Sequence, residues 1–177
     1  MAIAFLLVAD FGRDKASAES CREWFDSRIR SVETDDYSIK IHPPLISGYP
    51  YTNPTRFQVS IVPAHVGCGV ALDETEEQIP LTGAQLSRLG LFLYDMLRGA
   101  PGYQLAMVGW DVDFLLDVDE LTAHWSFEIS DGSFSGLVAR KSLLFKLPKS
   151  SCFTDFDDDH VWIPYAGSNA IGPTTPA

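Results

Sequence analysis

The segment from residue 108 to 121, VGWDVDFLLDVDEL, concentrates carboxylates in a stretch that is otherwise hydrophobic. Its acidic residues are Asp111, Asp113, Asp117, Asp119 and Glu120. Carboxylates at such short spacing could bind a divalent cation, transfer protons in catalysis or face a basic protein. The spacing excludes a calcium-binding EF-hand loop, because hydrophobic residues stand where that loop requires oxygen ligands and a glycine.

Ordinary local structure accounts for most of these acids. Asp111 and Asp113 are expected on the outward face of a strand end, because residues two apart share one face of a strand. Asp117 is expected to cap a helix, with Asp119 and Glu120 in the first turn, where carboxylates are favourable. We therefore expect no metal or catalytic site in this segment, and contact with a basic partner is the functional role that remains.

A second acidic segment, FTDFDDDHVWIPY, lies near the end of the chain. It contains Asp155, Asp157, Asp158, Asp159 and His160. These side chains could hold a divalent cation, but His160 stands where an EF-hand loop has its glycine. A single histidine after an acidic turn is more often a surface residue than a ligand, so we expect no metal here.

The segment HVGCG places His65 three residues before Cys68, which could make a nucleophile and its base or half of a zinc site. A reactive cysteine needs positively charged surroundings, whereas acidic residues follow this one. Zinc would need two further ligands, for which Cys152 and His160 remain without paired spacing. We expect no catalytic residue, metal or cofactor, and keep a metal-assisted or Cys/His-dependent hydrolase as the alternative function.

Acidic residues are unevenly distributed along the chain, whose formal net charge is −11. Residues 61–135 contain 12 acidic side chains and, as basic ones, Arg88 and Arg98, which gives this part a net charge of −10. A field of this sign repels nucleic acid and anionic lipid and speeds the encounter with a basic protein surface. We therefore expect a basic protein partner, no nucleic acid and no membrane.

The residues expected to contact such a partner are two acidic groups and two tyrosines that neighbouring prolines hold in a stiff loop. They are Asp73, Glu74, Glu76, Glu77, Asp111, Asp113, Asp119, Glu120, Tyr49 and Tyr51. This profile predicts an acidic protein-binding module, for example an immunity or inhibitor protein that neutralises a basic toxin or nuclease. A structural subunit of a larger assembly, contacting its neighbours around Trp162 to Tyr165, is a further alternative.

The first element expected is a strand over residues 2–9, hydrophobic on both faces and hence in the interior of a sheet. A signal peptide is not expected, because no basic residue precedes this stretch and charged residues follow at once. A helix should follow, from a cap at Ser17 to about Arg30, with Cys21 on its buried stripe.

Alternating hydrophobic residues predict strands near 37–42 and 57–62, which we expect to pair with each other. The segment 42–57 is rich in proline and is expected to be irregular. The clearest helix signal is the capping box formed by Thr82 and Gln85. Further elements are expected as a helix from 83 to 98, strands near 103–110, 136–139 and 160–165, and a short helix over 140–148. Segment 118–129 is expected to be a helix, although the alternation of Trp125, Phe127 and Ile129 would also allow it to end as a strand.

Together these elements predict a single α+β domain over residues 1–166, followed by a flexible C-terminal tail over 167–177. The sheet is expected to be mixed or mainly antiparallel, with about five strands and two to three packed helices. The 3 widely spaced cysteines argue against a disulfide framework and are typical of a reducing compartment. We therefore expect a cytoplasmic protein.

Overall fold

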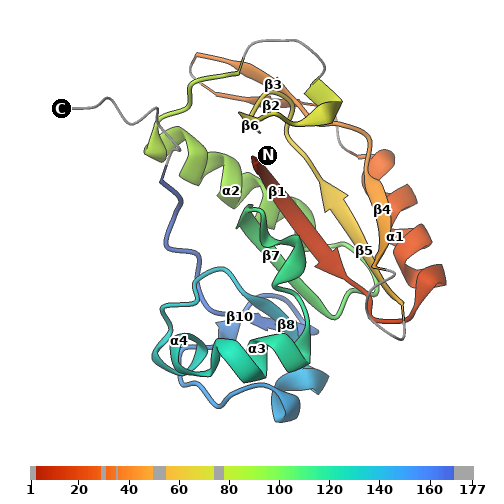
Figure 1. Ribbon diagram of the computed structural model, residues 1–177, viewed down its shortest axis with the longest axis vertical. Helices are drawn as coiled ribbons and strands as arrows, with labels where there is room; N and C mark the ends of the chain where they lie inside the picture. Colours follow the sequence, from red (N-terminus) through yellow and green to blue (C-terminus); the bar gives the residue numbers. More distant parts are fainter. Residues whose placement is uncertain (1–2, 29–30, 35, 50–54, 74–77, 170–177) are drawn as a thin grey trace.

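The computed structural model describes residues 3–28, 31–34, 36–49, 55–73 and 78–169, in which helices pack on both faces of a large sheet (Figure 1). Every strand pair in these ranges is antiparallel. No helix in them is long and apolar enough to cross a membrane. The α+β class with a mainly antiparallel sheet is thus confirmed.

The main sheet has the strand order β4-β5-β1-β7-β8-β10-β9, with β6 paired separately to β1, and β2 and β3 form a second sheet. The strands are β1 (Ile3–Asp10), β2 (Ser31–Glu33), β3 (Ser38–Lys40), β4 (Leu45–Tyr49), β5 (Arg56–Ile61), β6 (Gly67–Cys68), β7 (Leu105–Trp110), β8 (Val138–Arg140), β9 (Thr154–Asp155) and β10 (His160–Trp162). The expected number of about five strands is roughly met. Among the strands that were not expected, β2, β6 and β9 are two or three residues long, too short to show alternation in a sequence, whereas β4 has five residues.

The described chain contains four α-helices and three short 3-10 helices. They are α1 (Lys15–Asp26), α2 (Gly83–Leu97), α3 (Val118–His124) and α4 (Ser126–Asp131), with η1 (Ala71–Asp73), η2 (Val112–Phe114) and η3 (Lys141–Lys146). The capping box of α2 is confirmed, because Thr82 and Gln85 each accept the backbone N–H of the other, at 3.2 and 2.9 Å. The helix expected over 118–129 is present as two helices, divided at Trp125.

Strand β1 lies in the interior of the sheet between β5 and β7, as its hydrophobic faces predict. Its side chains alternate between two cores. Phe5, Leu7 and Ala9 belong to the core that includes α1 and α2, whereas Leu6 and Val8 belong to the core that includes α3 and α4. This two-sided burial fixes the register of β1, since a slip by one residue would exchange the two sets.

The expectation that segment 42–57 is irregular is wrong in part, because β4 pairs with β5 along the edge of the sheet. Pro43 and Pro44 precede β4 without interrupting it, so the amides of the strand remain able to pair. The expected pairing between the strands near 37–42 and 57–62 is also wrong. Strand β3 pairs with β2, and the link between the two segments in the described chain is an isolated bridge from Ile41 to Pro63.

Helix α1 starts earlier than expected and ends earlier, at Asp26 rather than near residue 30. Its N-cap is Asp14 instead of Ser17. The Asp14 carboxylate accepts the backbone N–H of Ser17 at 3.0 Å and the Ser17 hydroxyl at 2.7 Å. Aspartate and serine are equally good caps, so residue preference alone does not decide between them.

The segment that was expected to be a flexible tail begins with residues that contact the rest of the fold. Ser168 donates its N–H to the hydroxyl of Ser87 on α2 at 3.1 Å. Trp110 at the end of β7 donates its ring N–H to the carbonyl of Asn169 at 3.1 Å. Residues 170–177 lie outside the described chain, so the expectation for them stays a prediction.

Candidate functional site

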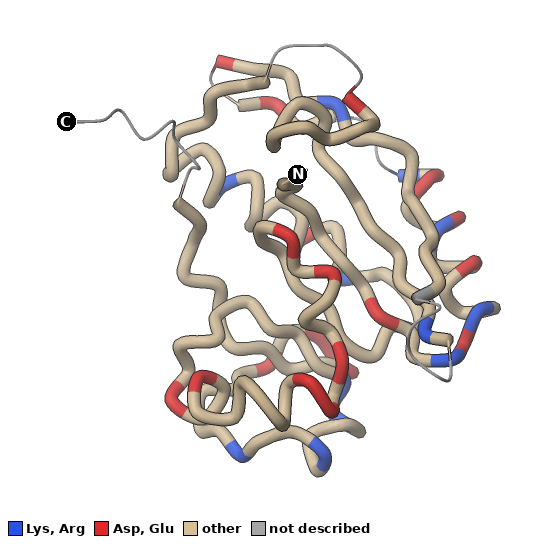
Figure 2. The backbone as a smooth tube through the Cα atoms, in the orientation of Figure 1, with Lys and Arg blue, Asp and Glu red and all other residues tan. Residues whose placement is uncertain are grey.

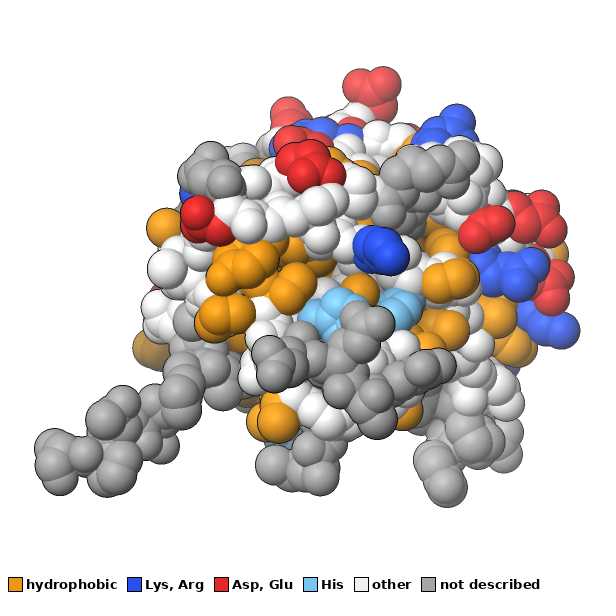
Figure 3. Space-filling view, turned by 90° about the horizontal axis from the view of Figure 1, so that it is seen from above, with side chains coloured by type: hydrophobic (Ala, Val, Ile, Leu, Met, Phe, Trp, Pro, Cys, Tyr) orange, Lys and Arg blue, Asp and Glu red, His pale blue; other side chains and the backbone are white. Residues whose placement is uncertain are grey.

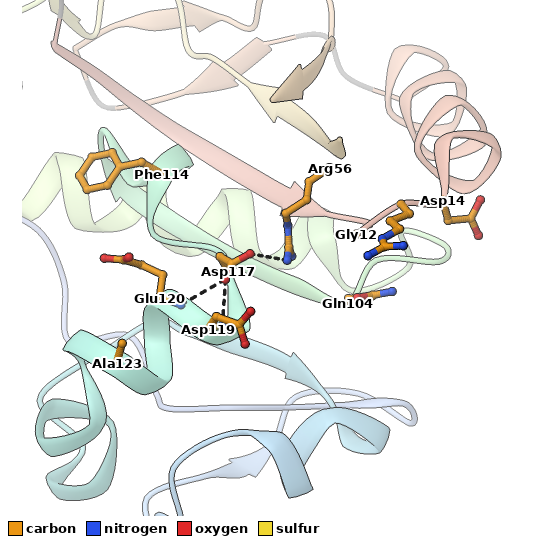
Figure 4. Close-up of a pocket in the computed structure, with 10 residues that line it drawn as sticks. Gly12, Asp14, Arg56, Gln104, Phe114, Asp117, Asp119, Glu120 and Ala123 are labelled. Carbon is orange, nitrogen blue, oxygen red and sulfur yellow. Dashed lines mark hydrogen bonds and ion pairs between the residues drawn. The ribbon is translucent and has the colours of Figure 1, made fainter. Parts of the chain in front are cut away.

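An open cleft of about 940 Å³ lies at the end of β1 and the start of β5, opposite the start of α3 (Figure 4). It is lined by Gly12, Arg13, Asp14, Arg56, Gln104, Phe114, Asp117, Asp119, Glu120 and Ala123. Four separate parts of the chain therefore meet in it: the turn from β1 to α1, the first residue of β5, Gln104 just before β7, and the segment from η2 to α3.

Arg56 forms the inner wall of the cleft and links two strands to a helix. Its guanidinium donates to Oδ1 of Asp10 on β1 and to Oδ2 of Asp117 at the start of α3, each at 2.5 Å. A further N–H reaches the carbonyl of Leu116 at 3.3 Å. Charge-assisted bonds of this kind are about twice as strong as neutral ones, so Arg56 holds α3 against the sheet.

Asp10 is fully buried behind Arg56 and accepts several hydrogen bonds. The turn after β1 contributes one of them, because Gly12, with φ of +57°, directs its N–H to Asp10 Oδ1 at 2.9 Å. Burial raises the pKa of Asp10 above its ordinary value, although Arg56 acts in the opposite direction. Burial acts to lower the pKa of Arg56, because it disfavours the charged guanidinium. The hydrogen bond and the negative charge of Asp10 outweigh this effect, so the pKa of Arg56 is raised.

Asp117 has two roles in this arrangement. Its Oδ1 accepts the backbone N–H groups of Asp119 at 2.8 Å and Glu120 at 3.1 Å, which confirms the expected N-cap of α3. Its Oδ2 receives Arg56 (Figure 4). The cap and the ion pair together fix the first turn of α3 at the edge of the cleft.

Asp119 and Glu120 are the carboxylates of this turn that are left facing outward. In the part of the chain that the structure describes, no lysine or arginine forms a salt bridge with either of them, and His124 lies 3.8 Å from Glu120. Glu120 extends toward the side of the cleft on which Phe114 lies (Figure 4). The Phe114 side chain is 63% exposed.

Asp111 and Asp113 do not lie on the outward face of a strand, because β7 ends before them at Trp110. Asp111 has a left-handed backbone with φ of 47°, and its Oδ1 accepts the N–H of Ala4 on β1 at 2.9 Å. Asp113 belongs to η2, and its carbonyl accepts the Gln58 side-chain amide at 2.9 Å. The hydrogen bonds of Asp111 therefore close the end of the sheet, a role that strand alternation does not predict.

Asp73 lies apart from the cleft, at the end of η1. Its Oδ1 contacts Nε2 of His42 at 2.7 Å and accepts the backbone N–H of His65 at 2.9 Å. Figure 3 shows histidine side chains gathered at the surface on the face seen from above. The other expected partner-binding residues of this region, Glu74, Glu76, Glu77 and Tyr51, lie outside the described residues, as does the side chain of Tyr49 at the end of β4.

The acidic segment 155–160 is engaged within the chain through Asp157 and His160, whereas Asp158 and Asp159 are exposed and line a smaller cavity of about 340 Å³. His160 was expected at the surface but is buried, with 4% exposure. Its ring stacks on Tyr103 with centroids 4.0 Å apart, and its Nδ1 lies 2.8 Å from Asp157 Oδ1. Within the described chain, no three His, Cys, Asp or Glu side chains are grouped so that they could hold a metal ion.

The residues that sequence reasoning missed are Asp10 and Arg56. Each is a charged residue in a strand that is otherwise mostly hydrophobic, and this was the available signal. A charge in such a strand is rarely left unpaired, so each predicts a partner without identifying it. The two are 46 residues apart in sequence, and β1 and β5 bring them together.

Comparison of the chain with models of protein families, with curated proteins and with solved structures gave no match. The charged side chains that line the cleft are mainly acidic. Its lining has two arginines, Arg13 and Arg56, against four carboxylates. Arg56 is already paired with Asp10 and Asp117, so the remaining charged groups of the lining are Asp14, Asp119 and Glu120 against Arg13.

Proposed function

We propose that the protein binds a basic segment of a partner protein in this cleft. The observation that carries the proposal is the position of Asp119 and Glu120, which line the cleft without a lysine or arginine salt bridge in the described chain. Figure 2 shows acidic residues gathered along the chain between β7 and α3. A concentrated negative field of this kind accelerates the approach of a basic protein and selects against acidic ones.

The structure narrows the set of acids available to a partner. The carboxylates of Asp73, Asp111 and Asp117 are engaged in hydrogen bonds within the chain. Asp119 and Glu120 remain, whereas Asp14 on the opposite side of the cleft is bonded to Ser17 and contributes only its negative charge. The proposed contact surface is therefore smaller than the acidic segment suggests.

Two features of the cleft suit a lysine or arginine side chain in particular. Its acids sit on a first helical turn that Arg56 and Asp117 hold in place, so little conformational entropy is lost on binding. The exposed ring of Phe114 offers a surface for the aliphatic part of such a side chain or for the face of a guanidinium. A basic toxin or nuclease, neutralised by occupation of its cationic surface, is a partner class with this chemistry.

Fluorescence anisotropy with a labelled arginine-rich peptide tests the proposal. We expect binding at low ionic strength that weakens steeply with added salt. The double variant D119K/E120K should weaken binding at least about tenfold, because two attractive contacts become repulsive. The matched control is E23K/D26K, which makes the same change of net charge at exposed positions near the end of α1.

The control separates a site from a general effect of charge. If both double variants lose affinity to the same extent, the peptide senses only the net charge of the molecule and the cleft is not its binding site. Loss confined to D119K/E120K, together with a smaller loss in Phe114→Ser, supports the cleft.

A further inference from the structure

Strand β4 forms one edge of the main sheet and lacks the features that usually keep such an edge from pairing with another molecule. Its residues, Leu45–Tyr49, include no charged side chain and no proline, and they pair with β5 without a bulge. Natural edge strands are commonly blocked by a charge, a proline or a bulge, or are very short. The opposite edge follows this rule, because β9 has 2 residues and one of them is Asp155. Strand β4 is therefore the edge at which the sheet can be extended.

The hydrogen bonds of β5 show which backbone groups of β4 point away from the sheet. In an antiparallel ladder the N–H and C=O of one residue point to the same side, and successive residues alternate. Phe57 donates its N–H to Gly12 at 2.8 Å and accepts the N–H of Phe11 at 2.9 Å, so both of its groups point toward β1. Gly48, which lies opposite Phe57, therefore directs its own groups away from β5, and so does Ile46. Within the described residues, no hydrogen bond reaches these outward groups.

Two prolines determine how an identical strand can pair along this edge. Pro44 and Pro50 flank β4 at equal distances in sequence from Ser47, and neither has an N–H to donate. An antiparallel pair centred on Ile46 would set Gly48 opposite Pro44, and one centred on Gly48 would set Ile46 opposite Pro50. A pair centred on Ser47 instead sets Ile46 of each copy opposite Gly48 of the other. In this register every outward N–H and C=O of the two strands has a partner.

The distribution of charge also favours a second copy at this edge. Residues 1–60, which include β4, β5 and α1, contain 8 acidic and 7 basic side chains, whereas residues 61–135 have a net charge of −10. Figure 2 shows the two signs interspersed along α1, beside β4. A basic partner is attracted to the acidic part of the chain, but two identical acidic molecules repel each other least at the nearly neutral part.

We propose that two copies of this chain form a dimer in which their β4 strands pair antiparallel about a two-fold axis at Ser47. Each of the two pairs of Ile46 with Gly48 exchanges both backbone hydrogen bonds, and the two sheets become one. Leu45, which is 41% exposed, comes to lie opposite Tyr49 of the second copy. The prolines end the pairing on both sides, so the contact is short and self-complementary and closes as a weak dimer.

Sedimentation velocity of the full chain from micromolar to millimolar concentration tests the proposal. At an ionic strength of about 0.15 M, the average sedimentation coefficient should rise with concentration to the value of a dimer and no further. Added salt should not weaken the association, because it screens the repulsion between two acidic molecules. A protein that stays monomeric over the whole range overturns the proposal, as does growth beyond a dimer.

A charge exchange at Ser47 locates the contact. The two Ser47 side chains lie directly opposite each other, with Cβ atoms about 4.5–5.5 Å apart, where like charges destabilise a strand pair. Ser47→Glu and Ser47→Lys should each weaken association at least about tenfold, and their mixture should recover it. The matched controls Ser151→Glu and Ser151→Lys alter an exposed serine just before β9 and should associate as the wild type does. Wild-type association of either Ser47 variant alone overturns the proposal.

Hydrogen exchange of the wild type tests the same contact without a substitution. The amides of Ile46 and Gly48 should exchange more slowly at millimolar than at micromolar concentration, because only the second copy accepts their hydrogen bonds. Exchange of these two amides that does not depend on concentration overturns the proposal. The outcome is independent of the cleft, since the variant D119K/E120K should still dimerise at least as strongly as wild type.

Discussion

At the scale of single residues, Arg56 connects strands β1 and β5 to the start of α3. It neutralises Asp10, which is fully buried, and holds Asp117 at the start of α3. Replacing Arg56 by methionine keeps much of the volume but leaves Asp10 as an uncompensated buried charge. We expect a loss of about 3 kcal/mol in the free energy of unfolding, measured by urea denaturation, at the lower end of the usual range because Arg56 itself is 19% exposed.

The matched control for this prediction is Arg13→Met, which removes an exposed arginine from the same cleft. Its effect on unfolding should stay within about 0.5 kcal/mol, as is usual at the surface. Equal free energies of unfolding for the two variants would show that the ion pair with Arg56 does not stabilise the buried Asp10. The second substitution Asp10→Asn, added to Arg56→Met, should recover part of the loss.

Asp157 gives the protein a defined dependence on pH. Partial burial acts to raise its pKa, but the hydrogen bond and charge of His160 and two backbone N–H donors outweigh it and hold the pKa below its ordinary value. A carboxyl with a lowered pKa stabilises the fold above the pKa of the unfolded chain, about 3.9. This contribution is lost as the pH falls through the lowered value in the folded state.

The variant Asp157→Asn should therefore unfold at lower urea than wild type at pH 7, and the difference should shrink as the pH falls below about 4. Asp158→Asn is the control, because Asp158 is exposed and loses the same charge. A difference between Asp157→Asn and wild type that is independent of pH would mean that only the packing of the side chain matters.

The three cysteines should differ sharply in their reaction with a thiol reagent. Cys68 is exposed and Cys152 partly exposed, whereas Cys21 is buried on α1, and burial raises the pKa of its thiol to about 12. A thiol reacts as the thiolate, so Cys21 should stay unmodified until the chain unfolds. Mass spectrometry of the native protein after labelling checks this, and rapid modification of Cys21 would contradict the burial of α1.

At this scale the sequence predicts contacts between near neighbours and misses those between distant ones. The capping roles of Thr82 and Asp117 were predictable because each side chain bonds to amides two or three residues ahead. The pairing of Arg56 with Asp10 was not, because many acidic residues are equivalent candidates in a chain read linearly. Asp111 was placed wrongly since its partner, the N–H of Ala4, lies 107 residues away.

At the scale of elements, α2 offers a direct test of its capping box. Thr82→Ala removes the hydroxyl that accepts the N–H of Gln85 and should lower the free energy of unfolding by about 1 kcal/mol. Thr82→Ser keeps the oxygen and should restore most of the loss. Urea denaturation of the two variants distinguishes a capping effect from the loss of a packed methyl group, which both variants share.

The elements that the sequence predicted best are those with a long hydrophobic period. Strand β1 has eight residues and helix α2 has fifteen. These lengths are enough to show hydrophobic residues on both faces of the strand and a hydrophobic stripe along one face of the helix. Strand β4 was not predicted, because the segment around it is rich in proline. These prolines lie outside the residues of β4 that pair with β5. Edge strands tolerate such neighbours, and only the position of β4 in the sheet reveals this.

At the scale of the whole molecule, the stability of the sheet should decrease from its interior to its edges. Strand β1 is paired along both sides, with β5 and β7, and is covered by a core on each face. Native-state hydrogen exchange should therefore be slowest for amides of β1 and β7 and much faster in β9, which is two residues long. Exchange of β9 as slow as that of β1 would contradict this gradient.

The same long-range pairing determines when the cleft can exist. Its walls join Asp10 to Arg56 across 46 residues and Arg56 to Asp117 across 61. Contacts of such sequence separation form slowly, because closing a long loop costs chain entropy before the contact can offset it. During synthesis, a nascent chain that has not yet released residue 117 from the ribosome exposes Asp10 and Arg56 without the helix that covers them. The cleft is thus a late product of folding, absent from any shorter intermediate.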